Sequence, residues 1–495
     1  DSVERAHDAR GVRPRAHVAS VTMRAHPAGP RHGDVSHPAG APPQPQSTGT
    51  SLELDPAIWP QTATRDARSG AITLGGCDVR DVVSDFGSPV LVMDEVDVRA
   101  RMSGYRDAFD DPTTSAHVYY AGKAFLSTTF ARWVREEGLR IDVCSGGELA
   151  CALRAGVPGE ALLMHGNNKS SEELAAALSA KVGYIVVDSF EEIARLGFLA
   201  QQGGVRPKVL IRVTLGVEAH THEFIATAHE DQKFGFSLAT GDAAEAIRRV
   251  LALPDRLELA GLHSHIGSQI FVSSGFEVAA ARIVGLLADV RDEHAVELPL
   301  LNLGGGLGIK YVSADEPPDV AQMAEVLREI VARQCANFGL ALPELAFEPG
   351  RAIVGPSTIT VYTVGTVKPI ALDAGGVRTY VSVDGGMSDN IRTALYDAEY
   401  TVTLASRVST APLVLCRVVG KHCESGDIVI NDCWLPGDLT AGDLLAVAAT
   451  GAYNRSMASN YNLIPRPPVV AVRDGNTQVL IRRETLDDLF ATDVG

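Results

Sequence analysis

HVYYAGKAF, residues 117–125, is a short apolar run that ends in a glycine and a lysine, Lys123. Seven more apolar runs end in polar or glycine-rich residues: LRIDVCSGGE (139–148), ALLMHGNN (161–168), YIVVDSFEE (184–192), KVLIRVT (208–214), LAGLHSHIGSQ (259–269), LPLLNLGGGLG (298–308) and ELAFEPGR (344–351). Stretches with helical periodicity, such as SEELAAALSAKV (171–182), separate these runs. Strands that alternate with helices indicate a parallel sheet. Eight such units predict a closed (β/α)8 barrel of the TIM type over residues 91–355, with its active site at the C-terminal ends of the strands.

The rest of the chain differs from this pattern in composition. Residues 1–51 are rich in Pro, Ala and His and lack periodic apolar residues, so we expect a disordered extension. Beyond residue 355, β-branched runs such as TITVYTVGTVKPI (358–370) are divided by Gly, Pro and Asp turns, which is typical of an antiparallel β-barrel or sandwich. We expect residues 52–90 to add a strand to this second domain, which would then comprise 52–90 and 356–495.

The composition limits the partners of the protein. A formal net charge of −17 over 495 residues argues against binding to nucleic acid or to an anionic membrane, because both repel an acidic surface. No apolar run reaches the roughly 20 residues that span a bilayer. The seven cysteines are odd in number and widely spaced, without the CxxC spacing of zinc or redox sites. We therefore expect a soluble, cytoplasmic protein without a metal site.

Lys123 is the first candidate for chemistry. It follows a buried strand and lies between apolar neighbours. Burial disfavours an ammonium group and is expected to lower the pKa of the lysine. A lysine with a lowered pKa is nucleophilic enough to form a Schiff base. The alternative, which the residue alone leaves open, is a lysine that extends from the barrel rim into solvent.

Glycines follow the last two predicted strands of the barrel. LNLGGGLG places Gly304, Gly305, Gly306 and Gly308 after strand seven, and EPGR places Gly350 after strand eight. Without side chains, backbone N–H groups can approach an anion at the start of a helix. A lone glycine run often marks only a tight turn. In this barrel, however, the loops after strands seven and eight frequently form a phosphate site, which the glycines therefore indicate.

A phosphate site and a Schiff-base lysine in one barrel predict pyridoxal 5′-phosphate as the cofactor. This cofactor needs an acid beside its pyridine nitrogen to serve as a full electron sink, and Glu348 is placed for that role. The alternative for Glu348 is an ion pair with Arg351. We expect His265 to lie against the cofactor ring and Ser268 to donate to the phosphate, and we interpret His263 as a core residue. Other polar residues at the same rim are candidate supports: Asp142, Ser145, His165, Asn167 and Arg212.

Ten motifs occur in one order along the chain: YYAGKAF (119–125), DVCSGGEL (142–149), HGNNKS (165–170), EAHTHEF (218–224), HSHIGSQ (263–269), GGGLG (304–308), EPGR (348–351), DGGMSDNIR (384–392), KHCESGD (421–427) and GAYNRSM (451–457). In these motifs the chain resembles the diaminopimelate decarboxylases, above all the actinobacterial members. More broadly it is similar to the fold-type III, alanine-racemase-like pyridoxal enzymes. The resemblance covers about residues 54–490, and the motifs are specific as a set.

The resemblance implies roles for residues at the cofactor. Lys123 would bind pyridoxal 5′-phosphate covalently, and Glu348 would face the pyridine nitrogen. The remaining residues of the cofactor site would be His265, Ser268, Gly305, Gly306, Gly350, Arg351 and Tyr453.

The resemblance also implies how the substrate is bound. Arg351, Arg392 and Tyr396, with Tyr453, would bind the carboxylate at the end of meso-diaminopimelate that does not react. Cys423, as proton donor, and Glu424, facing the distal ammonium, would come from the partner subunit of a homodimer. Because an enzyme selects one end of this substrate by binding the other, only the D-centre would lose CO2. The product would be L-lysine, in the last step of lysine synthesis.

Two other functions fit parts of the pattern. An ornithine, arginine or carboxynorspermidine decarboxylase would share Lys123, Glu348 and the phosphate loops. A substrate without a distal carboxylate would leave Arg351, Arg392 and Tyr396 poorly matched. A non-catalytic homologue that binds the cofactor would be expected to lack the lysine or the cysteine, and both positions are filled here.

Overall fold

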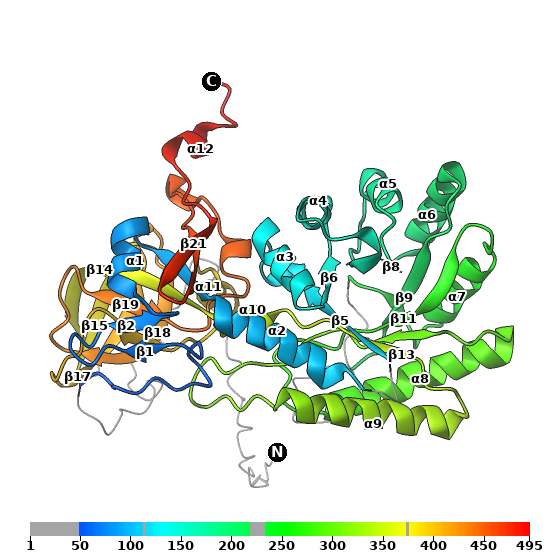
Figure 1. Ribbon diagram of the computed structural model, residues 1–495, viewed down its shortest axis with the longest axis horizontal. Coiled ribbons are helices and arrows are strands. Elements are labelled where there is room, and N and C mark those ends of the chain that lie inside the picture. Colours follow the sequence, from blue (N-terminus) through cyan, green and yellow to red (C-terminus); the bar gives the residue numbers. More distant parts are fainter. Residues whose placement is uncertain (1–48, 112–114, 218–232, 373–375) are drawn as a thin grey trace, which may run out of the picture.

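A computed structural model describes residues 49–111, 115–217, 233–372 and 376–495. The described residues form a barrel and a separate β domain, on the right and the left of Figure 1. Within these ranges, no helix combines the length and the apolar character that crossing a membrane requires. Residues 1–48 of the predicted extension and the motif EAHTHEF (218–224) lie outside the described residues.

The eight predicted strands form a closed, fully parallel barrel, as expected. Their order around the ring is β5-β6-β7-β8-β9-β11-β12-β13, and the pairing of β13 with β5 closes it. The strands are β5 (Ala116–Ala121), β6 (Arg140–Val143), β7 (Leu162–Met164), β8 (Tyr184–Val187), β9 (Lys208–Thr214), β11 (Glu258–His263), β12 (Leu300–Asn302) and β13 (Glu344–Phe347). A short strand, β10 (Phe236–Ser237), extends the sheet beside β9.

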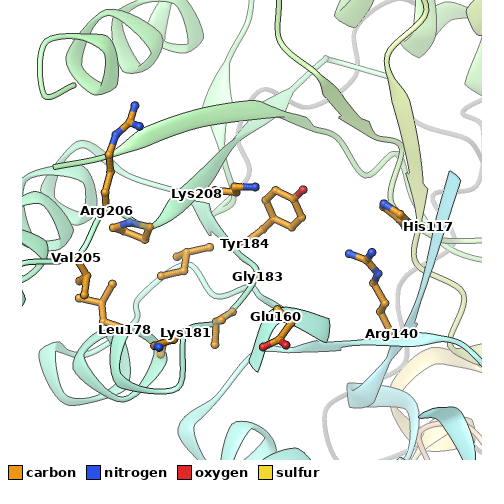
Figure 2. A pocket seen from close by; sticks show the side chains of 14 residues that line it. His117, Arg140, Glu160, Leu178, Lys181, Gly183, Tyr184, Val205, Arg206 and Lys208 are labelled. Atoms are coloured by element: carbon orange, nitrogen blue, oxygen red, sulfur yellow. The ribbon is translucent and has the colours of Figure 1, made fainter. Parts of the chain in front are cut away.

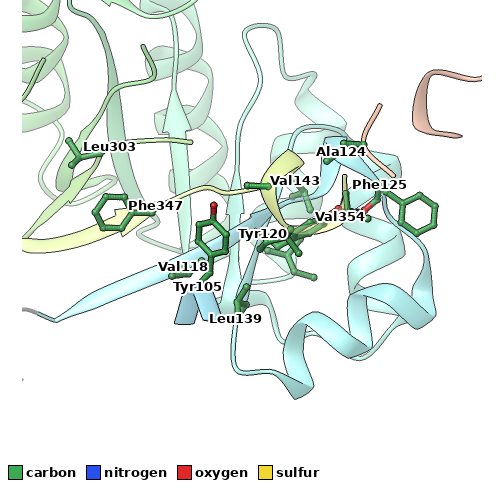
Figure 3. Packing of buried hydrophobic residues seen from close by; sticks show 14 of the residues in the cluster. Tyr105, Val118, Tyr120, Ala124, Phe125, Leu139, Val143, Leu303, Phe347 and Val354 are labelled. Carbon is green, nitrogen blue, oxygen red and sulfur yellow. Dashed lines mark hydrogen bonds between the residues drawn. The ribbon is translucent and has the colours of Figure 1, made fainter. Parts of the chain in front are cut away.

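The barrel strands are continuously apolar because both of their faces are buried. One set of alternating residues fills the interior: Tyr119, Leu163, Val186, Leu210, Ala260, Leu300 and Ala346. The other set points outward, against the surrounding helices. In Figure 3, Tyr105, Val118 and Phe347 belong to this outer layer. The interior layer leaves no open channel along the axis, so any site must lie at one end of the barrel.

Helices surround the barrel, and several of them begin at a side-chain cap. They are α2 (Glu95–Phe109), α3 (Thr128–Glu136), α4 (Gly146–Arg154), α5 (Ser171–Ser179), α6 (Phe190–Gly203), α7 (Asp242–Leu251), α8 (Ser274–His294), α9 (Val320–Phe338) and the short α10 (Arg351–Val354). The hydroxyl oxygens of Ser127, Ser145, Ser170 and Ser189 accept backbone N–H bonds at four of these starts. Ser145, a candidate support of the site, is therefore the N-cap of α4.

The second domain contains a mixed sheet. Its central path is β18-β17-β15-β14-β4-β20-β21, and β16 and β19 pair beside β14. Most pairs are antiparallel as expected, but β15 with β17 and β20 with β4 are parallel. The strands are β4 (Val90–Asp94), β14 (Thr358–Ala371), β15 (Val377–Val383), β16 (Val402–Leu404), β17 (Leu413–Val419), β18 (Ile428–Pro436), β19 (Leu444–Val447), β20 (Val469–Arg473) and β21 (Asn476–Ile481). Three helices accompany them: α1 (Val79–Phe86), α11 (Arg392–Tyr396) and α12 (Leu486–Phe490).

The segment before the barrel packs against this β domain in two ways. Strands β1 (Thr64–Arg65), β2 (Ile72–Leu74) and β3 (Cys77–Asp78) pair only with one another, and their apolar side chains join a core with β4 and β14. Only the first residue of β4 (residue 90) belongs to the segment expected to add a strand, and β4 lies between β14 and β20. Residue 91, the predicted start of the barrel, thus falls inside a strand of the other domain. We propose that the barrel domain begins at α2.

Candidate active site

A cavity of about 400 Å³ opens at the C-terminal ends of the barrel strands. Nine of the predicted site residues line it: Lys123, His265, Ser268, Gly305, Gly306, Glu348, Gly350, Arg351 and Tyr453. Four of the candidate supports, Asp142, His165, Asn167 and Arg212, line it as well. Residues from the barrel strands thus meet in one cavity, because parallel strands bring their C-terminal ends to the same face. Tyr453 reaches this cavity from the segment after β19 of the second domain.

Glu348 is held from three sides at the end of β13. Its Oε1 accepts hydrogen bonds from His165 Nε2 and Asn302 Nδ2, both at 2.8 Å, and its Oε2 lies 3.3 Å from His263 Nε2. Burial alone would raise the pKa of Glu348, but the two histidines outweigh it and hold the pKa well below its usual value. The carboxylate is therefore ionised and fixed in direction. The alternative of an ion pair between Glu348 and Arg351 is not observed, because Arg351 bonds to other groups.

The charge of Glu348 fixes the tautomers of the two histidines. An ionised carboxylate can only accept, so each Nε2 that faces it carries the hydrogen. The Nδ1 atoms of both rings are buried and have no hydrogen-bond partner among the described residues. Burial lowers the pKa of His263 to about 4, so this ring is neutral at pH 7. One nitrogen of each histidine and a Glu348 carboxylate oxygen lie within 4.8 Å of one another, close enough to hold a metal ion. Hydrogen bonds between the histidines and Glu348 account for these short distances. His263 is thus part of the site rather than a simple core residue.

Lys123 lies in a 3₁₀ turn, Gly122–Ala124, directly after β5. Burial alone would lower its pKa, as the sequence predicted. Asp142, Tyr453 and Glu348 outweigh burial and raise the pKa above its ordinary value. The prediction that the pKa of Lys123 is lowered is therefore wrong, because carboxylates from other strands stabilise its ammonium group. Burial in turn raises the pKa of Asp142 to about 7.

The glycine loops lie beside this carboxylate and this amine. Added Cβ atoms would lie 2.0 Å from the Glu348 carbonyl oxygen at Gly305 and 2.3 Å from the Gly267 carbonyl oxygen at Gly306. At Gly350 a Cβ would lie 2.9 Å from the Ala121 Cβ. Only glycine permits these approaches. The three positions thus form a cradle of backbone without side chains.

Two arginines converge on one tyrosine at the edge of the cavity. Arg351 donates to the Tyr311 hydroxyl at 2.6 Å and to the Ser268 hydroxyl at 3.0 Å. Arg392 donates to the same Tyr311 hydroxyl at 3.0 Å and to Tyr400 at 2.6 Å. Arg392 is buried and does not itself line the cavity. The two guanidinium groups are therefore held near one another by a shared acceptor.

The other predicted substrate residues lie apart from this cavity within the chain. Tyr396, at the end of α11, is 62% exposed, and Cys423 is also exposed. Neither these residues nor Glu424 line the cavity. A single chain thus brings the predicted cofactor residues together but not Tyr396, Cys423 and Glu424.

Comparisons with known proteins agree with this geometry. The family model described as "Pyridoxal-dependent decarboxylase, pyridoxal binding domain" matches residues 95–355. A diaminopimelate decarboxylase of Mycobacterium leprae (strain TN) is 52% identical over 476 residues, which are 95% of this chain and 100% of that protein. The chain belongs to the diaminopimelate decarboxylase family.

Two further matches extend the range of the family. The diaminopimelate decarboxylase of Bacillus subtilis (strain 168) is 45% identical over 431 residues, which are 87% of this chain and 97% of that protein. The crystal structure of the diaminopimelate decarboxylase from M. jannaschii in co-complex with L-lysine matches with a TM-score of 0.81 and 29% identity. The match covers 88% of this chain and 98% of the M. jannaschii chain. The fold described here is therefore the fold of diaminopimelate decarboxylases.

The residues of this family member fit the cofactor that its family model names. Pyridoxal phosphate has an aldehyde, a pyridine nitrogen and a phosphate. The cavity offers an amine at Lys123, an ionised carboxylate at Glu348, and the glycine cradle with the Ser268 hydroxyl. A carboxylate that only accepts hydrogen bonds suits a protonated ring nitrogen.

Sequence reasoning missed two residues that shape this diaminopimelate decarboxylase site. Asn302, at the end of β12, donates to Glu348 and accepts from the Gly304 N–H at 2.8 Å. Tyr311, nine residues further on, joins the two arginines. Asn302 could have been found, because it is the one polar residue that ends the run LPLLN before the glycines. Tyr311 carries no comparable signal.

Proposed function

We propose that this chain decarboxylates meso-2,6-diaminopimelate at its D-centre, giving L-lysine and CO2, with pyridoxal 5′-phosphate as its cofactor. The observation that carries the proposal is the constellation of Lys123, Glu348 and Arg351 in one cavity with the glycine cradle. When bound, the cofactor would accept the electron pair that CO2 leaves on the substrate carbon as it departs. The protein residues would bind and orient the reactants and move protons.

Lys123 and Glu348 would hold the two ends of the cofactor ring. The Lys123 amine would bind the aldehyde and, once replaced by the substrate amine, would stay within reach as a base. Glu348 would accept a hydrogen bond from the ring nitrogen and keep it protonated. Because His165, His263 and Asn302 already fix its carboxylate, little reorganisation would be needed.

The glycine cradle would bind the phosphate group. The backbone at Gly305, Gly306 and Gly350, with the Ser268 hydroxyl, lies on the side of the cavity that carries Arg351. Tyr453 would complete this end, since the Arg351 guanidinium lies 4.8 Å from its ring centroid. His265, with a pKa lowered to about 3 by burial, would be a neutral ring beside the cofactor.

Arg351 and Arg392 would select the end of the substrate that does not react. Two guanidinium groups held by one tyrosine can bind a carboxylate with defined geometry, which a lysine cannot match. Binding the L-centre in this way leaves the D-centre at the cofactor. A substrate without a distal carboxylate, such as ornithine, would leave both arginines without an anion.

We also propose a homodimer with shared active sites. Cys423 and Glu424 would reach the cavity of the partner subunit, since they do not line the cavity of their own chain. Tyr396 would join Arg351 and Arg392 at the distal carboxylate. Cys423 would donate the proton that replaces CO2, and Glu424 would bind the distal ammonium. The seven cysteines are free, which supports our proposal of a reducing, cytoplasmic location.

The test is CO2 release from meso-diaminopimelate, with and without added cofactor, against ornithine as the control substrate. The proposal expects cofactor-dependent release from meso-diaminopimelate and little from ornithine. Replacement of Arg392 by Gln should reduce this preference by raising KM for meso-diaminopimelate more than it lowers kcat. Faster release from ornithine, or release without the cofactor, would contradict the proposal.

A further inference from the structure

A second cavity lies at the opposite end of the barrel from the candidate active site. It has a volume of about 590 Å³, within the range of small-molecule sites. Its walls carry the first residues of three strands, Arg140 of β6, Tyr184 of β8 and Lys208 of β9, together with His117 near the start of β5. Figure 2 shows these four side chains around one space. The interior layer of the barrel separates this cavity from the active site.

The charge of this cavity is opposite to that of the protein. The chain has a net charge of −17, yet the cavity is lined by Arg140, Lys181, Arg206 and Lys208 and by a single acid, Glu160. Arg206 is paired with Glu258 at 3.6 Å. Within the described ranges, Arg140, Lys181 and Lys208 form no ion pair. Three positive side chains without an ion-pair partner among the described residues and one acid, Glu160, therefore line the same cavity.

The positive groups are combined with apolar and aromatic surface. The Lys208 ammonium lies 5.9 Å from the Tyr184 ring centroid, and Arg140 donates to the Tyr119 hydroxyl at 3.1 Å. The remaining wall comes from α5, from β8 and from the segments after α5 and α6: Ala177, Leu178, Val182, Ile185, Val205 and Pro207. An inorganic ion would leave this apolar wall in water. An organic anion would cover the wall and meet the charges together.

The rim of the cavity is a fixed structure. The Gly183 N–H donates to the Gly159 carbonyl at 2.9 Å. A Cβ at Gly159 would lie 1.7 Å from the Ala180 carbonyl oxygen, and one at Gly183 would lie 2.4 Å from that of Glu160. Lys181, which lies between these contacts in the chain, has a φ of 54°, a backbone conformation that residues other than glycine rarely adopt. Such strain is often kept where a side chain has a function.

We propose that this cavity binds a small organic dianion with an apolar or aromatic body. Its negative groups would be bound by Arg140, Lys208 and Lys181, and its body would lie between Tyr184 and the aliphatic wall. The ordinary alternative is a solvated rim of charges that binds nothing, because this end of such barrels usually serves stability.

Calorimetric titration of the cofactor-loaded enzyme with phthalate, an aromatic dicarboxylate, tests the proposal. For a ligand of this size we expect a dissociation constant of about 1 mM or tighter at low salt. Phthalamide, the neutral isostere, should bind much more weakly, and added salt should weaken phthalate binding. No heat of binding with phthalate, or equal binding of phthalamide, would overturn the proposal.

Matched variants locate the site. Lys208→Gln and Arg140→Gln should each weaken phthalate binding about tenfold, as expected for the loss of a charge-assisted hydrogen bond. Arg206→Gln is the control, because this arginine is paired with Glu258 and extends away from the cavity in Figure 2. Arg392→Gln reports binding at the active site instead. Loss of binding in Arg392→Gln or Arg206→Gln, with Lys208→Gln unchanged, would overturn the proposal. Circular dichroism confirms that each variant is folded, and Lys181→Gln replaces any variant that is not.

Discussion

Replacement of Asn302 by Ala tests how the acid of the active site is held. Asn302 is fully buried at the end of β12. Its Nδ2 donates to Glu348 Oε1 at 2.8 Å, and its Oδ1 accepts from the Gly304 N–H at 2.8 Å. One side chain thus ties the carboxylate to the glycine cradle. The alanine variant removes both bonds and leaves the Gly304 N–H buried without a partner.

The size of the effect follows from these two bonds. A hydrogen bond to a charged group is worth about 1.5–3 kcal/mol, and an unsatisfied buried N–H costs about 1–3 kcal/mol. We therefore expect a loss of roughly 3–5 kcal/mol in the stability of the barrel. The first bond also aims Glu348 at the cofactor, so its loss should weaken cofactor binding by about 10- to 100-fold.

Cofactor affinity is measured from the absorbance of the bound cofactor in a titration, and stability from the thermal midpoint. Asn460→Ala is the matched control, because Asn460 donates to Glu484 at 2.6 Å and does not line the cavity. It should lower the midpoint and leave cofactor affinity unchanged. The reasoning is refuted if Asn302→Ala binds the cofactor as tightly as the wild type.

Four further results are expected. Gly305→Ala should bind the cofactor at least about tenfold more weakly, because its Cβ would lie 2.0 Å from the Glu348 carbonyl oxygen. Gly104→Ala is the control, because no atom lies within 4 Å of a Cβ added there. Equal cofactor affinity of the two variants would contradict the expected clash. His263→Gln should reduce the fall in thermal midpoint between pH 7 and pH 5. The buried His263 has a pKa of about 4 and the unfolded residue one of about 6.5. Only the unfolded chain therefore takes up a proton on His263 in this window, and stability falls as the pH falls. The same change of thermal midpoint with pH in His263→Gln and the wild type would contradict this explanation. Cys423→Ala should keep the cofactor absorbance and slow turnover by about 10- to 1,000-fold. An equal mixture of Cys423→Ala and Lys123→Ala subunits should regain about a quarter of the wild-type activity if active sites are shared. Half of the dimers would then contain one subunit of each kind and one intact site of two. No recovery of activity would contradict shared active sites.

The barrel could be predicted because its signal is local. Each strand is a short apolar run that ends in a polar residue, and each is followed by a helical period, so the eight units can be counted from the sequence. The β domain gave a weaker signal. β4, VLVMD, resembles a barrel strand because it is an apolar run that ends in a polar residue. Only its pairing with β14 and β20 shows that it belongs to the other sheet. Such long-range pairing has no local signature.

The meeting of the candidate site residues in one cavity could be predicted from the sequence, but the effects of their neighbours on them could not. Lys123 and Glu348 stand at strand ends, and the barrel rule places both at one face. The raised pKa of Lys123 depends on Asp142 and Glu348, which approach it only in the folded chain. For the same reason, the role of His263 as a donor to Glu348 could not be separated from that of a core histidine.

The most direct test of the whole account is to locate the bond between protein and cofactor. Borohydride reduction of the enzyme loaded with pyridoxal phosphate makes this bond permanent, and peptide mapping then identifies the modified lysine. We expect modification of Lys123. Modification of Lys233, which lines the same cavity, or of the buried Lys169 instead of Lys123 would contradict it.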